Sequence, residues 1–72
     1  MFSYRAYQLS HERTFLPSIL HQESDEDAIA EAKKLVRNLP IEVWQGDRRV
    51  AKVTPDGQIY LPRAGRFTAN VD

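Results

Sequence analysis

The sequence contains no cysteine, and this absence excludes several kinds of chemistry at once. Disulfides, thiolate zinc sites and cysteine nucleophiles all require that residue. A secreted chain of 72 residues would usually need disulfide staples, because so small a domain buries only a modest apolar core. We therefore expect one small domain in a reducing, cytoplasmic environment.

An excess of charge and long apolar runs are also missing. Ten basic side chains balance ten acidic ones. This balance disfavours a nucleic-acid binder, whose affinity depends on neutralising phosphates. The apolar runs are far shorter than the ~20 residues of a membrane span, so no membrane partner is expected. Residues 1–5 lack a basic segment followed by an apolar run, and we expect no signal peptide.

The clearest local signal is a helix over about residues 25–37. Ser24 is a favourable N-cap with an acidic residue, Asp27, three positions later. Asn38 suits a left-handed C-cap, and Pro40 prevents continuation of the helix. One apolar stripe at helical spacing is formed by Ala28, Ile29, Ala32, Leu35 and Val36.

Alternating and β-branched segments predict strands on both sides of the helix. These segments are Phe2–Leu9, Thr14–Gln22, Ile41–Gln45, Arg48–Val53 and a short Gln58–Leu61. Pro17 indicates an edge strand or a bulge, and Gly46-Asp47 is typical of a two-residue hairpin turn. The predicted fold class is α+β, with the order β-β-α-β-β and one helix on one face of an antiparallel sheet.

Two strand orders are compatible with this succession. The order 2-1-3-4 is favoured, and the order 1-2-3-4 with a parallel central pair is the alternative. We expect the domain to span residues 1–61. Residues 62–72 have no periodic apolar face and are expected to form a mobile tail.

Three segments together resemble a group of short bacterial proteins of unknown function. They are residues 4–7, residues 24–28 and the pattern Glu-Val-Trp-x-Gly-x-Arg at residues 42–48. The resemblance covers roughly residues 4–53 and implies the same architecture and a cytoplasmic location. The first loop in such proteins often reads Asp-x-Asp-Gly, and residues 10–13 depart from that pattern. No activity comes with the resemblance.

Catalytic and metal chemistry are not expected. The only plausible metal-ligand set is His11, Glu12, His21 and Glu23. His11 falls in the first loop and His21 at the far end of the hairpin, too far apart to share an ion. The acids at residues 25–27 already serve a helix N-terminus. No nucleophile has a base and an orienting group beside it, so we expect neither an enzyme nor a cofactor.

The strand registers predict a second apolar face that one helix cannot cover. A four-residue first loop pairs Leu9 with Thr14, and the second turn pairs Gln45 with Arg48. The face opposite the helix then carries Tyr7, Leu9, Leu16, Leu20, Trp44, Ala51 and Val53. We expect a non-enzymatic protein-interaction module whose second face is covered by a protein partner, a second copy or the C-terminal tail.

The predicted binding residues are Trp44, Arg49, Arg48, Tyr7, Leu16 and Leu20. Arg49 is expected to lie over the indole of Trp44, a favourable cross-strand pair. Tryptophan, tyrosine and arginine are enriched in binding hot spots. The alternative interpretation places Trp44 in the core, with Arg49 shielding its edge.

A weak nucleic-acid binder is the alternative function. Its phosphate contacts would come from Arg48, Arg49, Lys52, Arg63 and Arg66. Trp44, Tyr60 or Phe67 would then stack on bases.

Overall fold

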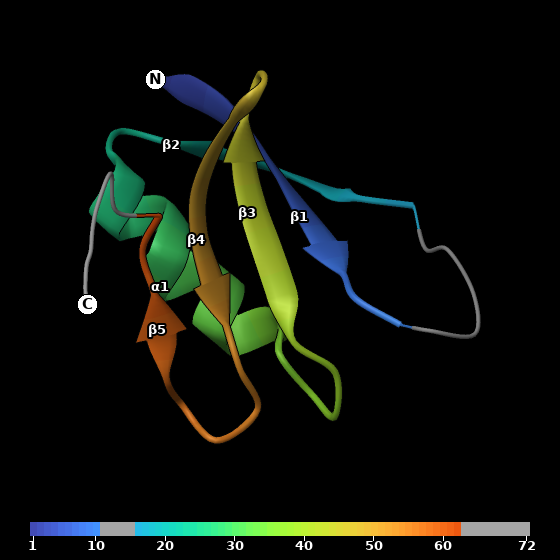
Figure 1. Ribbon diagram of the computed structural model, residues 1–72. Helices are drawn as coiled ribbons and strands as arrows, with labels where there is room; N and C mark the ends of the chain where they lie inside the picture. Colours follow the sequence, from blue (N-terminus) through green and yellow to red (C-terminus); the bar gives the residue numbers. More distant parts are fainter. Residues whose placement is uncertain (11–15, 63–72) are drawn as a thin grey trace.

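The computed structural model describes residues 1–10 and 16–62. Its elements are β1 (Phe2–Gln8), β2 (Ser18–Gln22), α1 (Asp25–Leu35), β3 (Ile41–Gln45), β4 (Arg48–Val53) and β5 (Ile59–Tyr60). The strands form one five-stranded sheet in the order β2-β1-β3-β4-β5, and each neighbouring pair is antiparallel. Figure 1 shows α1 behind this sheet. The predicted α+β class and the favoured 2-1-3-4 order are confirmed, and β5 extends the sheet beyond β4.

Helix α1 begins where the sequence predicts and ends two residues earlier. The Ser24 hydroxyl accepts a hydrogen bond from the Asp27 amide at 3.2 Å, which satisfies a first-turn donor. At Val36 the backbone is already extended, with φ −66° and ψ 134°. Arg37 Nη1 donates to the carbonyl oxygens of Lys34 and Val36 at 3.1 and 3.3 Å. A side chain therefore satisfies carbonyls at this end of the helix.

The Ser24→Ala substitution is expected to lower the free energy of unfolding by about 1 kcal/mol, because it leaves a first-turn amide without its acceptor. Urea denaturation followed by circular dichroism measures the effect. Ser18→Ala is the control, since Ser18 is exposed at the start of β2. If both variants kept the wild-type midpoint, the capping role would be wrong.

The core lies between α1 and one face of the sheet. Its buried residues are Tyr4, Ala6, Ala28, Ala32, Ile41, Val43, Val50, Ala51 and Val53. The helix contributes alanines to this cluster, and these short side chains bring its backbone close to the strands. Leu20, Ile29, Leu35 and Val36 pack around the cluster and are partly buried.

The first hairpin has a different register from the one predicted. Tyr4 pairs with Leu20 and Arg5 with Ile19, whereas the sequence analysis paired Tyr4 with Ile19. A shift of one residue exchanges the two faces of a strand. Leu20 therefore packs against the core on the helix side, and Ile19 lies 54% exposed on the other side.

Strand β2 is also shorter than predicted at its N-terminal end. It starts at Ser18, directly after Pro17, which has no amide to donate to a ladder. Leu16 precedes the strand and is 93% exposed, so the prediction that it belongs to a sheet face is wrong. Residues 14 and 15 of the predicted strand lie outside the described residues.

A β-bulge changes the second hairpin. Next to the turn the register is as predicted, with Gln45 opposite Arg48 and Trp44 opposite Arg49. Beyond the bulge Val43 pairs with Ala51, so Val50 is the inserted residue. The insertion turns Ala51 and Val53 toward the helix, where both are buried. The prediction that these two residues lie on the opposite face is therefore wrong.

The end of the described chain forms the last hairpin. The predicted turn at residues 55–57 is confirmed, because the Gly57 amide donates to the Thr54 carbonyl and the Thr54 amide to the Gln58 carbonyl, both at 3.0 Å. Gly57 has a φ of 90°, a conformation that favours glycine. Apart from the exposed Pro62, the predicted mobile tail lies outside the described residues.

Candidate functional site

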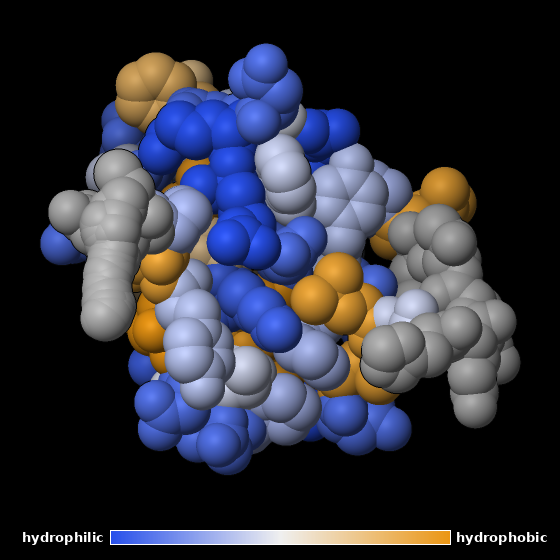
Figure 2. Space-filling model, in the orientation of Figure 1, coloured by the Kyte–Doolittle hydropathy of each residue, from blue (hydrophilic) through white to orange (hydrophobic). Residues whose placement is uncertain are grey.

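The sheet face opposite α1 is covered by no helix or strand of the described residues (Figure 1). Strand alternation and the registers place on it, among others, seven central side chains of the four adjoining strands β1, β3, β4 and β5. They are Arg5, Tyr7, Glu42, Trp44, Arg49, Lys52 and Tyr60, which we call the open face. Figure 2 shows that the view onto this side is mostly hydrophilic, with limited hydrophobic patches.

Glu42 organises one half of the open face. The indole Nε1 of Trp44 donates to Glu42 Oε1 at 3.1 Å, and Arg49 Nη1 donates to Glu42 Oε2 at 3.0 Å. The Glu42 side chain is only 20% exposed, so both of its oxygens are held close to the sheet. The carboxylate therefore fixes the orientation of the tryptophan and of the arginine together.

Arg5 organises the other half. Its Nη1 donates to the Tyr7 hydroxyl at 2.7 Å, and its guanidinium carbon lies 5.4 Å from the centroid of the Tyr7 ring. Its Nη2 also donates to the carbonyl oxygen of Gly46 in the β3–β4 turn. Arg5 stands opposite Trp44 in the ladder, so the two halves are adjacent. The result is a preorganised surface of aromatic rings and guanidinium groups.

Three of the six predicted binding residues come together on the open face: Tyr7, Trp44 and Arg49. The predicted placement of Tyr7 and Trp44 opposite the helix is confirmed by the registers and by the buried core on the other side. The predicted cation–π pair was Arg49 over Trp44. In the structure Arg49 is instead paired with Glu42, and the arginine that lies over an aromatic ring is Arg5, over Tyr7.

The other three predicted residues lie elsewhere. Arg48 reaches the helix side, Leu20 packs against the core and Leu16 is exposed before β2. Arg5 and Glu42 belong to the open face but were not predicted as binding residues. Both alternate in step with Tyr7 and Trp44 along their strands, and that spacing is the signal that could have found them.

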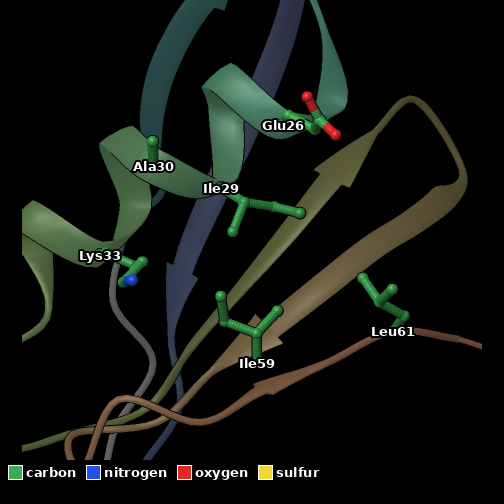
Figure 3. A pocket seen from close by; sticks show the side chains of 6 residues that line it. All are labelled: Glu26, Ile29, Ala30, Lys33, Ile59 and Leu61. Carbon is green, nitrogen blue, oxygen red and sulfur yellow. The ribbon is translucent and has the colours of Figure 1, made fainter.

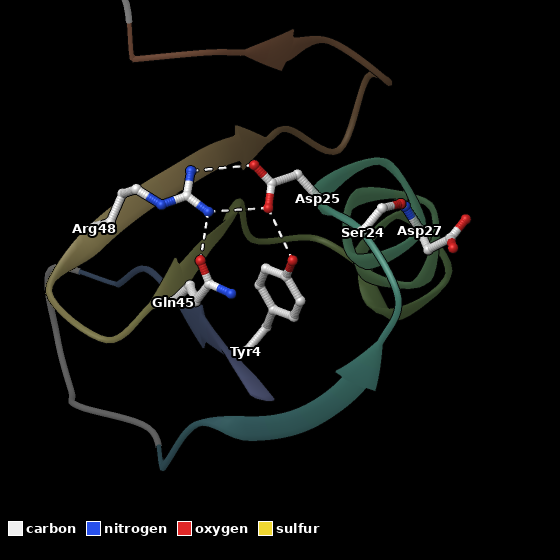
Figure 4. A network of polar contacts seen from close by, with 6 residues as sticks. All are labelled: Tyr4, Ser24, Asp25, Asp27, Gln45 and Arg48. Atoms are coloured by element: carbon white, nitrogen blue, oxygen red, sulfur yellow. Dashed lines mark hydrogen bonds and ion pairs between the residues drawn. The ribbon is translucent and has the colours of Figure 1, made fainter. Parts of the chain in front are cut away.

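Arg48 belongs to a separate polar network on the helix side of the sheet, drawn in Figure 4. Its Nη1 and Nη2 donate to the two carboxylate oxygens of Asp25 at 3.1 and 3.0 Å. The hydroxyl of the buried Tyr4 donates to Asp25 Oδ1 at 2.8 Å. Arg48 Nη2 also donates to Gln45 Oε1, so the network joins β1, β3, β4 and the first residue of α1 (Figure 4). Both oxygens of the Asp25 carboxylate accept hydrogen bonds, so the network ties the start of α1 to the sheet.

The network shifts two titrations. Hydrogen bonding from Arg48, and then from Tyr4, lowers the pKa of the Asp25 carboxyl below its ordinary value. Burial raises the pKa of the Tyr4 hydroxyl, and its hydrogen bond to Asp25 raises it further. Near neutral pH Asp25 is therefore ionised and Tyr4 is protonated, which is the arrangement that the hydrogen bonds require.

Acid is expected to remove the contribution of Asp25 to stability. Because the folded-state pKa lies below the unfolded value of about 3.9, the stabilisation is complete well above pH 4 and is lost as the pH falls through the lower folded-state pKa. Asp25→Asn should thus be clearly less stable than wild type at pH 6, and the difference should shrink near pH 2.5. Urea midpoints at the two pH values measure it. An equal difference at both would contradict this role for Asp25.

Residues 1–10 and 16–62 hold few other groups that could form a site. No group of three or more His, Cys, Asp or Glu side chains in these ranges is placed to hold a metal ion. His21 Nδ1 lies 3.3 Å from the Ser3 hydroxyl, and His11 is outside the described residues. The described part of the chain also has no helix with the length and apolar character needed to cross a membrane.

Comparison of the chain with protein-family models, curated proteins and solved structures gave no significant match. The resemblance to short bacterial proteins therefore stays a prediction. The side chains of the open face are the remaining indication of function.

Proposed function

We propose that the protein is a non-enzymatic protein-interaction module that binds its partner through the open face. The observation that supports this most is the fixed pairing of Trp44 and Arg49 on Glu42, next to the Arg5–Tyr7 contact. Side chains that are ordered before binding lose less conformational entropy on association. Tryptophan, tyrosine and arginine are also the residue types that contribute most to binding hot spots.

The charges of the open face favour an acidic partner. Arg5, Arg49 and Lys52 are cationic, and Glu42 is the only acid in the set. Both oxygens of Glu42 are already bonded within the face, so its charge is largely offset. A segment with carboxylates beside an apolar or aromatic side chain would match the cations and the rings together.

Two of the arginines that a nucleic-acid binder would use are engaged by carboxylates, which disfavours that function. Arg48 is paired with Asp25 on the helix side, and Arg49 is paired with Glu42. Lys52 and Arg5 are the remaining cations of the open face. Arg63, Arg66 and Phe67 lie outside the described residues. Nucleic-acid binding is therefore the less favoured function.

The test is calorimetric titration with three probes: a synthetic peptide rich in Asp, Glu and Phe, a matched peptide with Lys in place of Asp and Glu, and a single-stranded RNA of mixed sequence. We expect the peptide to bind at moderate salt and the RNA to bind more weakly. Tight RNA binding with a steep salt dependence would favour phosphate contacts and would contradict the proposal. Failure of the acidic peptide together with binding of a basic one would contradict the partner chemistry.

Trp44→Ala is expected to reduce peptide binding at least tenfold, as loss of a hot-spot aromatic does. Its cost to folding should be only about 1–2 kcal/mol, because the side chain is partly buried and lies outside the core cluster. Calorimetry and urea denaturation of the same variant separate the two effects. A loss of ~3–5 kcal/mol in stability would instead identify Trp44 as core. His21→Ala, at the margin of the face, is the control for binding.

A further inference from the structure

A shallow groove of about 330 Å³ runs between α1 and β5, on the helix side of the sheet. It is lined by Glu26, Ile29, Ala30, Lys33, Ile59 and Leu61. Figure 3 shows the apolar side chains along the groove, with Glu26 at the end near Leu61 and Lys33 at the end near Ile59. Helix α1 packs mainly over β2, β3 and β4, and the groove lies beyond them, toward β5.

Strand β5 is the last strand of the sheet in the described residues, and the apolar side chains at this edge are exposed on both faces. Ile59, Tyr60 and Leu61 are 40%, 56% and 57% exposed. Natural sheets usually protect such edges with charged side chains, proline or a covering element. Neither residue of β5 is charged or a proline, and Pro62 follows only after Leu61.

The backbone amides and carbonyls at β5 point alternately toward β4 and away from it, and those that point away are available to pair with another strand. The Gln58 carbonyl accepts from the Thr54 amide, so Gln58 points its backbone groups toward the neighbouring chain segment. Backbone groups alternate in direction along an antiparallel strand. Tyr60 therefore also points inward, opposite Lys52, and the amides and carbonyls of Ile59 and Leu61 point outward.

We propose that β5 pairs antiparallel with β5 of a second copy of this chain, about a two-fold axis at Tyr60. Under this symmetry Ile59 of each copy faces Leu61 of the other, and their outward amides and carbonyls become mutual hydrogen-bond partners. The two sheets join into one continuous sheet. The grooves of the two copies then meet in a single apolar seam lined by Ile29, Ile59 and Leu61.

Charge complementarity selects a second copy as the occupant. The two helices lie antiparallel across the seam, so the Glu26 end of one groove meets the Lys33 end of the other, twice. Neither Glu26 nor Lys33 forms an ion pair within the described residues, whereas the adjacent Lys34 is engaged by Glu31 at 3.1 Å. The acid and the base at opposite ends of the groove are thus self-complementary about the two-fold axis.

Sedimentation equilibrium of the full chain, from about 10 μM to 1 mM, measures this association. We expect a monomer–dimer equilibrium. Glu26→Lys and Lys33→Glu should each weaken it about tenfold, because each turns two attractive contacts into repulsive ones. Lys34→Glu makes the same change in net charge one residue along the helix, and it should leave the dimer intact. Circular dichroism checks that every variant is folded.

Two combinations test the two-fold geometry itself. The double variant E26K/K33E should dimerise like wild type, because both contacts are restored with exchanged signs. A mixture of E26K and K33E should form a heterodimer more readily than either variant forms a homodimer. A chain that is monomeric throughout, or a dimer insensitive to these charges, would overturn the proposal. Binding of acidic peptide to the open face is measured separately, so either conclusion can fail alone.

Discussion

Tyr4→Ala is expected to lower the free energy of unfolding by about 3–5 kcal/mol, the range for truncation of a buried aromatic side chain. Tyr4 is 1% exposed, and its ring is the largest side chain in the core cluster. Its hydroxyl also holds Asp25 at the start of α1, so the substitution removes a hydrogen bond as well as packing. A domain of this size has a total stability of roughly 4–11 kcal/mol, so the substitution would remove a large part of it.

Two further tyrosine variants separate packing from hydrogen bonding. Tyr4→Phe keeps the ring and removes the hydroxyl, which should cost about 1–2 kcal/mol. Tyr60→Ala removes a ring that is 56% exposed and should change stability by no more than ~0.5 kcal/mol at low protein concentration. Urea denaturation of the three variants gives the order of their free energies of unfolding. If Tyr4→Ala cost no more than Tyr60→Ala, the placement of Tyr4 in the core would be wrong.

Ile41→Ala is expected to cost about 2–5 kcal/mol, because truncation leaves a cavity in the centre of the sheet. Ile41 is 2% exposed and lies opposite Val53 in the β3–β4 ladder. Ile19→Ala is a matched control with the same change of atoms at a position that is 54% exposed. It should cost under ~1 kcal/mol. Similar losses for the two variants would mean that the assignment of buried and open faces is incorrect.

The parts of the fold that were predictable are those with local signals. Ser24 and the acids that follow it mark the helix start, and Gly46-Asp47 marks the second hairpin. The bounds of β3 and β4 follow from these signals and match the structure. The end of the helix was less predictable, because a side-chain cap by Arg37 competes with the cap expected from Asn38.

The face of each residue beyond a bulge was not predictable. Val43, Val50 and Ala51 are all apolar, so nothing in their order shows which of them is the inserted residue. Tertiary packing decides, because the bulge buries Ala51 and Val53 together beneath the helix. The same reason explains Leu20: its side is set by the register, and the loop that determines the register has no distinctive turn sequence.

Because of the bulge in β4 and the register of β2, the open face lies where it was predicted but carries different side chains. The apolar side chains expected on it from β4 and β2 are mostly packed in the core. What remains is Trp44 and Tyr7 with Arg5, Glu42 and Arg49. An apolar patch would favour any hydrophobic cover, whereas a patterned surface of rings and cations favours a partner with carboxylates.

The most direct test of the open face is a ¹⁵N–¹H correlation spectrum of the protein during titration with the acidic, Phe-containing peptide. The account predicts shifts concentrated at Arg5, Tyr7, Trp44 and Arg49, including the indole N–H of the single tryptophan. The amide of Ala32, in α1 on the other side of the sheet, should not move. Shifts confined to the groove between α1 and β5, or an unchanged indole signal at saturation, would contradict the proposed binding surface.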